Sequence, residues 1–313
     1  MKNIKYYIGI DIGGTNIKTG VIDENGAIIS EHSIPTGAHR QQEEVLNDII
    51  LSVKASINGA NVNPEDIAGA GMGTPGMIDI EKGIVIYNNN LGWRNFAVSS
   101  EMSKAIGMKV RLENDADAAA LGEVIAGSAK GAKSAMIITL GTGVGSGYVV
   151  NGKIVQGCEF GHMVIDYGGR ECTCGRKGCF ESYCSATGLI NMTKELISKN
   201  PDSILSLTAK KEGTVSGRTV FDAAVKGDNE ASELIDKYIS YLSCGLVNII
   251  NGLQPEVISL GGGIAKQGER LLTPLRKKVH TEIYEGIKFP KIVTCTLGYK
   301  AGLIGAAMSA REI

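Results

Sequence analysis

The sequence predicts an α/β protein in which one arrangement of strands occurs twice. Strands rich in β-branched residues alternate with segments of helical periodicity along the 313 residues, a pattern typical of mixed α/β architecture. Two segments, beginning at Tyr6 and at Ala135, each run through a buried strand, a Gly-rich turn, a second strand and an Asn-Gly hairpin turn. The similarity between Gly9–Gly20 and Thr139–Gly147 is weak, so the duplication is predicted for the structure rather than for the sequence.

In the first half, an apolar run over Tyr6–Ile12 predicts a buried strand that ends at the Gly13-Gly14 turn. Apolar residues recur at helical spacing between Gln41 and Ile57, and an Ala-rich segment predicts a helix over 116–126. The other strands expected in this half are 16–22, 27–34, 67–72 and 109–112.

The second half begins with a strand over Ala135–Leu140, followed by a strand over 147–150 and the turn at Asn151-Gly152. The apolar spacing of Ala231–Asn251 predicts its longest helix. The remaining expectations are strands at 257–260 and 292–296 and helices at 186–198, 220–225, 271–283 and 301–310.

Composition restricts the possible classes of protein. The length suggests two domains or one large α/β domain. A formal net charge of −1 argues against a nucleic-acid partner or an anionic membrane surface. Seven cysteines, an odd number, fit a reducing compartment better than a disulfide framework. Asp11 interrupts the first apolar run, so no signal peptide is indicated, and a cytoplasmic location is expected.

Three Gly-rich loops follow predicted strands, and the first runs from Asp11 to Lys18. Gly13 and Gly14 let backbone N–H groups turn toward an anion, and Thr15 and Lys18 add donors. Asp11 is placed to hold a magnesium ion through water. The alternative is a tight hairpin with a solvated lysine.

The second loop contains Thr142 and Gly143, and the third contains Gly262 and Gly263. The second loop resembles a dinucleotide fingerprint, but a strand follows it instead of a helix, which argues against a Rossmann site. Three such loops in one chain favour a cradle for a nucleotide.

Asn114 and Asp115 come directly after a predicted strand and before a predicted helix. The carboxyl ends of strands are where α/β proteins bind ligands, so Asp115 is a candidate base that accepts a hydroxyl proton during phosphoryl transfer. The alternative, which applies equally to Asp117, is helix capping by acidic residues.

The segment 159–181 combines metal-ligand residues with two carboxylates. His162, Cys172, Cys174 and Cys179 form a Cys₃His set, the ligand number of a closed structural zinc site. Metal binding there would stabilise an otherwise irregular loop. A catalytic zinc is the alternative, but four protein ligands leave no open position.

These motifs, taken together, resemble the ROK family (repressors, open reading frames and kinases). The resemblance extends from residue 8 to about residue 310. The segments that carry it are Asp11–Thr15, Gly73–Gly76, Asn114-Asp115, Leu140–Gly143, Glu159–His162 and Cys172–Glu181.

The resemblance implies an actin-like, ribonuclease-H-like ATPase fold with two lobes around a cleft. An N-terminal lobe would comprise residues 1–115, closed by the C-terminal helix 300–313. The larger lobe would comprise residues 116–299 and carry the zinc loop 159–181.

The implied activity is an ATP-dependent hexose kinase of glycolysis that phosphorylates the sugar 6-hydroxyl. Asp115 would be the base, and ATP with Mg²⁺ would meet Thr142, Gly143, Gly262 and Gly263. His162 would ligate zinc through one nitrogen and contact sugar through the other. The residues implied to contact the sugar are Gly76, Asn90, Asn114, Glu159, His162 and Glu181.

Glucose is the expected substrate. Kinases for mannose, fructose, allose, N-acetylmannosamine or N-acetylglucosamine share the motifs, and the resemblance also implies a homo-oligomer, a dimer or tetramer. A sugar-sensing repressor of the same family would need an N-terminal helix-turn-helix domain, for which no room precedes Asp11. A chaperone-like or filament-like ATPase would have no use for the sugar-contacting residues.

Overall fold

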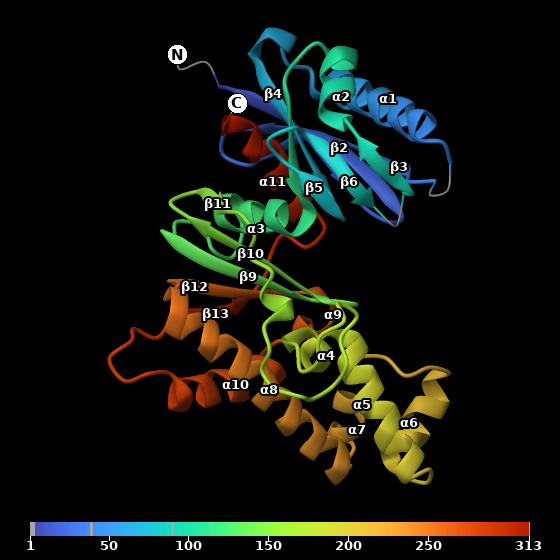
Figure 1. Ribbon diagram of the computed structural model, residues 1–313, viewed down its shortest axis with the longest axis vertical. Coiled ribbons are helices and arrows are strands. Elements are labelled where there is room, and N and C mark those ends of the chain that lie inside the picture. The colour runs from blue at the N-terminus through green and yellow to red at the C-terminus, as the bar shows by residue number, and fades with distance from the viewer. Residues whose placement is uncertain (1–3, 38–39, 89–90, 313) are drawn as a thin grey trace. The chain divides into compact units, whose positions relative to one another are not determined.

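The computed structural model describes residues 4–37, 40–88 and 91–312. Two five-stranded sheets have the same strand order (Figure 1), β3-β2-β1-β4-β8 in the first and β11-β10-β9-β12-β13 in the second. In each sheet the first three strands form a meander and the last two come from crossovers. The predicted duplication is therefore confirmed, although the sequences of the halves have diverged.

The first sheet consists of β1 (Tyr6–Ile12), β2 (Asn16–Asp23), β3 (Ile28–Pro35), β4 (Ile67–Thr74) and β8 (Val110–Asn114). The second consists of β9 (Ser134–Leu140), β10 (Val144–Val150), β11 (Lys153–Val155), β12 (Val257–Gly261) and β13 (Lys291–Thr294). A three-stranded sheet, β5 (Met77–Asp79), β6 (Ile84–Asn88) and β7 (Trp93–Phe96), was not expected from the sequence.

The helices near the first sheet are α1 (Gln42–Ala60), α2 (Val98–Ile106), α3 (Asp115–Ala126) and α11 (Lys300–Ser309). The others are α4 (Phe180–Cys184), α5 (Ala186–Lys199), α6 (Ile204–Glu212), α7 (Thr219–Val225), α8 (Asn229–Leu253), α9 (Gly262–Ala265) and α10 (Glu269–Glu282). Most predicted elements are present within a few residues of their expected bounds. None of the helices in the described part of the chain has both the length and the apolar character that crossing a bilayer requires.

The chain divides into two compact units. The first unit comprises Met1–Lys133, Gly147–Gln156 and Thr296–Ile313, and the second comprises Ser134–Ser146 and Gly157–Cys295. The first unit is larger than the N-terminal lobe expected over 1–115, because α3 packs closely against α11 and stays with it.

Alternation along the strands of the first sheet separates two packed faces. Ile8, Ile10 and Met72 belong to a fully buried cluster that also takes in residues of α1 and α2. The opposite face carries Gly9 and Gly71, where an added Cβ would overlap carbonyl groups of α11. The missing side chains let α11 lie directly on the sheet.

The long helix α8 lies at the centre of the helical core of the second unit. Leu242, Leu246 and Ile250 on α8 are completely buried, and α8 packs against α4, α5, α7 and α10. This packing fixes α4 and α5, which carry residues of the candidate site.

Candidate active site

The carboxyl ends of three neighbouring parallel strands meet at one edge of the first sheet. Asp11 on β1 lies opposite Gly73 on β4, and Thr74 lies opposite Asn114 on β8. The predicted phosphate loop, the Gly73–Gly76 turn and the Asn114-Asp115 pair are therefore brought together within the first unit. This is the edge where α/β sheets bind ligands.

Asn114 is the N-cap of α3. Its Oδ1 accepts hydrogen bonds from the backbone N–H groups of Ala116, at 2.8 Å, and Asp117, at 3.3 Å. The capping interpretation is thus correct for Asn114, whose amide NH₂ can still donate to a ligand. Asp115 occupies the first helical position, where its Oδ1 accepts the Ala116 N–H at 2.9 Å. The helix N-terminus stabilises an ionised carboxylate there.

Asp11 is a strongly perturbed carboxyl group at this edge. Burial raises its pKa to about 6, the Lys18 ammonium opposes this rise, and the nearby Asp115 adds to it. Backbone of α11 covers the side chain, because an added Cβ on Gly302 would lie 3.0 Å from the Asp11 carboxyl carbon. Two adjacent carboxylates, one of them poorly solvated, are chemically suited to a hard divalent cation.

Glu113 is a further buried carboxyl group next to the Asn114-Asp115 pair, and it was not among the predicted site residues. It is fully buried, and burial raises its pKa although Gln156, Arg111 and the Asn114 N–H oppose that rise. Gln156 Nε2 donates to Oε1 at 3.1 Å, and the N–H of Asn114 donates to the same oxygen at 3.2 Å. Glu113 therefore helps to fix the backbone of the pair, a role that a lone acidic residue in a strand does not reveal.

The loop between β1 and β2 is a closed turn. Gly13 donates its N–H to the carbonyl of Asn16 at 3.0 Å, and a Cβ at Gly13 would lie 2.8 Å from that same oxygen. The Thr36 hydroxyl donates to the Gly13 carbonyl at 2.6 Å. Gly14 and Thr15 are exposed at the tip, so their backbone groups are accessible to a ligand.

The basic residue of this loop is held in place by an aromatic ring. The Lys18 ammonium lies 4.0 Å from the centroid of the Tyr299 ring. Lys18 is also the register partner of Asp11. The Tyr299 ring thereby keeps the Lys18 ammonium near the sheet edge. A solvated lysine in a plain hairpin would not require such a contact.

The turn after β4 depends on a glycine. Gly76 has φ of +102°, and an added Cβ would overlap the carbonyl of Tyr87. The Asn88 side chain braces the turn by donating to the Pro75 carbonyl at 2.9 Å. Asn90, the other residue predicted here, lies outside the described residues.

In the second unit, α4 and α5 hold the Gly-rich loop that follows β9. The N–H of Ala186 donates to the Gly141 carbonyl, and the Thr187 hydroxyl donates to the Thr142 carbonyl, both at 2.7 Å. Glu181 Oε2 accepts the N–H of Val144 at 2.9 Å. Strand β10 begins at Val144, so the loop is shorter than the sequence suggested.

Glu181 connects this loop to the predicted metal ligands. A Cβ on Gly143 would overlap its carboxylate, while its Oε1 accepts the Thr173 hydroxyl at 3.2 Å. Glu159 precedes a single turn of 3₁₀ helix, Phe160–His162, and its carbonyl accepts the His162 N–H at 3.1 Å. The side chain of Glu159 is exposed.

The four predicted metal ligands converge. The Nδ1 atom of His162 and the Sγ atoms of Cys172, Cys174 and Cys179 lie within 4.8 Å of one another. His162 Nδ1 is 3.6 Å from Cys172 Sγ, and the Sγ atoms of Cys174 and Cys179 are 3.7 Å apart. A tetrahedron with Zn–S bonds of about 2.3 Å has edges of roughly 3.5–3.8 Å. The donor types and these two separations therefore fit zinc.

A cavity of about 530 Å³ lies beside the third Gly-rich loop in the second unit. Gly262 has φ of +85° and could not carry a side chain without overlapping Leu140, and Gly263 lines the cavity. Its other lining residues include Arg218, Lys266 and Arg270. These cations could not be predicted from the sequence, because they come from a loop and a helix without a recognisable motif.

The repeated sheet order agrees with the two-lobe, actin-like ATPase fold that the family resemblance implies. The family model described as "ROK family" matches residues 7–313. The chain belongs to the ROK family, which confirms the resemblance.

The most similar proteins include enzymes and regulators. The glucokinase of Halalkalibacterium halodurans is 35% identical over 98% of this chain and 96% of its own. The xylose repressor of Bacillus subtilis is 27% identical over 97% of this chain and 76% of its own.

Two solved structures are similar over nearly the whole chain. The ROK hexokinase from Thermus thermophilus has a TM-score of 0.84 and 29% identity, with 98% of both chains covered. The ROK family glucokinase from Streptomyces griseus in complex with glucose and AMPPNP has a TM-score of 0.76 and 31% identity. Its alignment covers 98% of this chain and all of the other.

Proposed function

We propose that this chain is an ATP-dependent hexose kinase that transfers the γ-phosphoryl group of ATP to the 6-hydroxyl of glucose. The observation that carries the proposal is the meeting of Asp11, Asn114 and Asp115 at one sheet edge. The similarity to glucokinases supports glucose as the sugar. The Gly-rich loops are proposed to contact ATP, and the cation-lined cavity beside Gly263 in the second unit supports that role.

Asp115 is the general base in this proposal. As the sugar oxygen forms its bond to the γ-phosphorus, the bond from that phosphorus to the ADP oxygen breaks, and the hydroxyl proton passes to the Asp115 carboxylate. The position of the Asp115 carboxylate matters more for this role than a shifted pKa, and the helix cap formed by Asn114 fixes that position. Magnesium brought with ATP would be held near Asp11 and would neutralise phosphate charge.

The polar groups proposed to contact the sugar are those that the family resemblance implies. Asn114 and the Gly76 turn are two of them, and Asn90 remains part of the proposal. Glu159, His162 and Glu181 are proposed to contact the sugar as well. Glu181 is oriented for this task by the Val144 N–H and the Thr173 hydroxyl.

The Cys₃His cluster is proposed to hold a structural zinc ion. Nδ1 of His162 is the nitrogen that faces the thiols, which leaves Nε2 as a donor to a sugar hydroxyl. All four positions would be filled by protein, so the metal would stabilise the loop and would not activate water. The thiols of this cluster suit a reducing compartment, which is the basis for proposing a cytoplasmic location.

The similarity to xylose repressors makes a sugar-binding regulator the second candidate. Such a protein needs the sugar contacts but has no use for a base. Asp115 at the helix N-terminus, next to the partly buried Asp11, is superfluous for binding alone. Kinases for other hexoses or N-acetylhexosamines remain within the same proposal, as do homo-oligomers.

The test is the release of ADP from ATP and magnesium across a panel of hexoses and N-acetylhexosamines. Asp115→Asn is the matched variant, because it keeps the shape of the side chain and removes the base. We expect turnover that is highest on glucose and falls by about 10²–10⁴-fold in the variant, while glucose binding measured by calorimetry persists. Glucose binding without turnover in the folded wild type would favour the regulator instead.

A further inference from the structure

Backbone pairing alone gives the segment that carries the predicted metal ligands the form of a hairpin. Val164 pairs with Cys179, and Glu171 pairs with Lys177, as two isolated antiparallel bridges. Between them, the Gly178 N–H donates to the Arg170 carbonyl at 2.7 Å. An added Cβ at Gly178, whose φ is +81°, would overlap the backbone of the facing strand. Backbone pairing therefore sets the register of the residues that carry the predicted ligand atoms.

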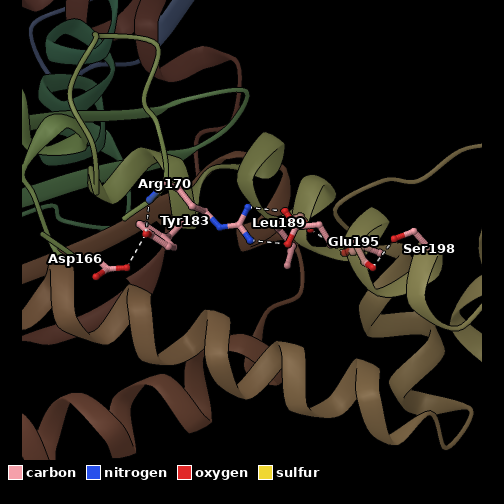
Figure 2. A network of polar contacts seen from close by, with 7 residues as sticks. Asp166, Arg170, Tyr183, Leu189, Glu195 and Ser198 are labelled. Atoms are coloured by element: carbon pink, nitrogen blue, oxygen red, sulfur yellow. Dashed lines mark hydrogen bonds and ion pairs between the residues drawn. The ribbon is translucent and has the colours of Figure 1, made fainter. Parts of the chain in front are cut away.

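A polar network holds this hairpin against helices α4, α5 and α8 (Figure 2). The Tyr183 hydroxyl donates to Asp166 Oδ2 at 2.7 Å and accepts the backbone N–H of Arg170 at 2.8 Å. The Arg170 guanidinium forms two parallel hydrogen bonds with Glu195 on α5, both at 2.7 Å. The Tyr183 ring packs at a tilt against the ring of Tyr241 on α8, with 4.2 Å between the ring centroids. None of these residues is a metal ligand.

The position of Arg170 in the hairpin gives the network its importance. Its N–H, its carbonyl and its guanidinium are all engaged, to Tyr183, Gly178 and Glu195 respectively. Arg170 precedes Cys172 by two residues, and Gly178 directly precedes Cys179. The hydrogen bonds of Arg170 therefore restrict the position of one predicted ligand on each strand of the hairpin, Cys172 and Cys179.

The two parts of the network contribute unequally to the stability of the hairpin. The Arg170–Glu195 pair is partly exposed, at 35% and 52% of the side-chain surface, and exposed ion pairs contribute little even with good geometry. Tyr183 is 2% exposed, so its hydroxyl satisfies two groups in a water-poor setting, where loss of a partner costs more. Tyr183 is expected to be the stronger anchor.

We propose that Tyr183 and Arg170 are positioning residues that hold the hairpin in its metal-binding form before the metal arrives. The inference rests on the proposed metal site. Apparent metal affinity scales with the fraction of protein whose site is already formed. A network that raises this fraction raises the affinity, and it does so without touching the ion. Because Glu181 follows Cys179 by two residues, the same network also steadies the carboxylate proposed to meet the sugar.

The experiment compares wild type, Tyr183→Phe, Arg170→Lys and Lys177→Ala. Lys177→Ala is the matched control, because it removes an exposed ion pair with Glu171 in the same hairpin but lies outside the network. Zinc affinity is measured by competition with a chromogenic chelator. Hydrogen exchange of residues 163–178 is measured separately on metal-free protein.

We expect Tyr183→Phe to lower zinc affinity by roughly tenfold or more, the scale typical of groups that support metal ligands, with Arg170→Lys showing a smaller loss. Exchange in the metal-free hairpin should be faster in both variants and unchanged in Lys177→Ala. Wild-type zinc affinity and exchange in Tyr183→Phe would overturn the inference. A wild type that binds no zinc would instead refute the proposed metal site, and the exchange data would still decide whether the network orders the hairpin.

Discussion

Replacing Asp11 by Asn should stabilise the protein at neutral pH in magnesium-free buffer without nucleotide. The pKa of Asp11 is raised to about 6 from its ordinary value of 3.8, mainly by burial. A carboxyl group whose pKa is raised by folding binds its proton more tightly in the native state. Its ionisation therefore costs stability, and the cost grows as pH rises from about 4 to about 6.

The magnitude follows from the size of the pKa change. About two pKa units at 1.36 kcal/mol each give an upper limit of about 3 kcal/mol, and the side chain is only partly buried, so we expect a gain of about 2 kcal/mol at pH 7. Asn cannot ionise but keeps the shape of the protonated acid. The gain should disappear near pH 4, where both side chains are neutral.

Urea unfolding at several pH values between 4 and 7.5 measures this difference. Glu31→Gln, at an exposed position on β3 of the same sheet, is the control and should follow the wild type. A constant offset between Asp11→Asn and wild type over the whole range would refute the reasoning, because the effect would then not come from ionisation. Kinase activity should fall in the same variant, since the group proposed to sit near magnesium loses its charge.

Three further variants test other parts of the structure. Cys174→Ala should lose zinc and lower the melting temperature, since a three-ligand site is not closed, whereas Cys244→Ala, away from the cluster, should keep its metal by elemental analysis. Equal zinc content in both would contradict the structural role. Gly143→Ala should raise the KM for the sugar roughly tenfold, because the new methyl group displaces the Glu181 carboxylate, whereas Gly252→Ala on α8 has open space around it and should leave kinetics unchanged. Glu123 is buried and accepts N–H groups of Ser128, Thr296 and Leu297 at 2.7–3.0 Å. Glu123→Gln should therefore lower the free energy of unfolding by about 2–4 kcal/mol, an estimate that fails if the urea midpoint moves no more than for the exposed Glu233→Gln.

The sequence predicted the parts of the fold whose signal is local. Periodicity located β1, α1 and α8 because each has an apolar stripe or run of its own. It missed β5, β6 and β7, whose strands are three to five residues long and therefore too short to show alternation. Helix α2 was missed for a related reason, since its nine residues are too few to repeat an apolar period clearly.

The same division applies to the site. The metal ligands follow from spacing, and the spacing is kept in three dimensions. The ion pair of Arg170 and Glu195 cannot be predicted from spacing, because twenty-five residues separate two ordinary charged side chains. The raised pKa of Asp11 also depends on distant residues, since α11 contributes to its burial. Such features arise from tertiary packing, which a single sequence does not display.

The place of α11 in the first unit has a consequence for synthesis on the ribosome. This helix covers β1 and β4, yet it is made after every residue of the second unit. While the second unit is being translated, the glycine-lined face of the first sheet has no partner. The second unit can therefore acquire its complete set of contacts earlier, which reverses the usual N-terminal-first order. Nascent chains released before Lys300 should expose the β1–β4 surface to chaperones, while residues 157–295 are already protected from protease.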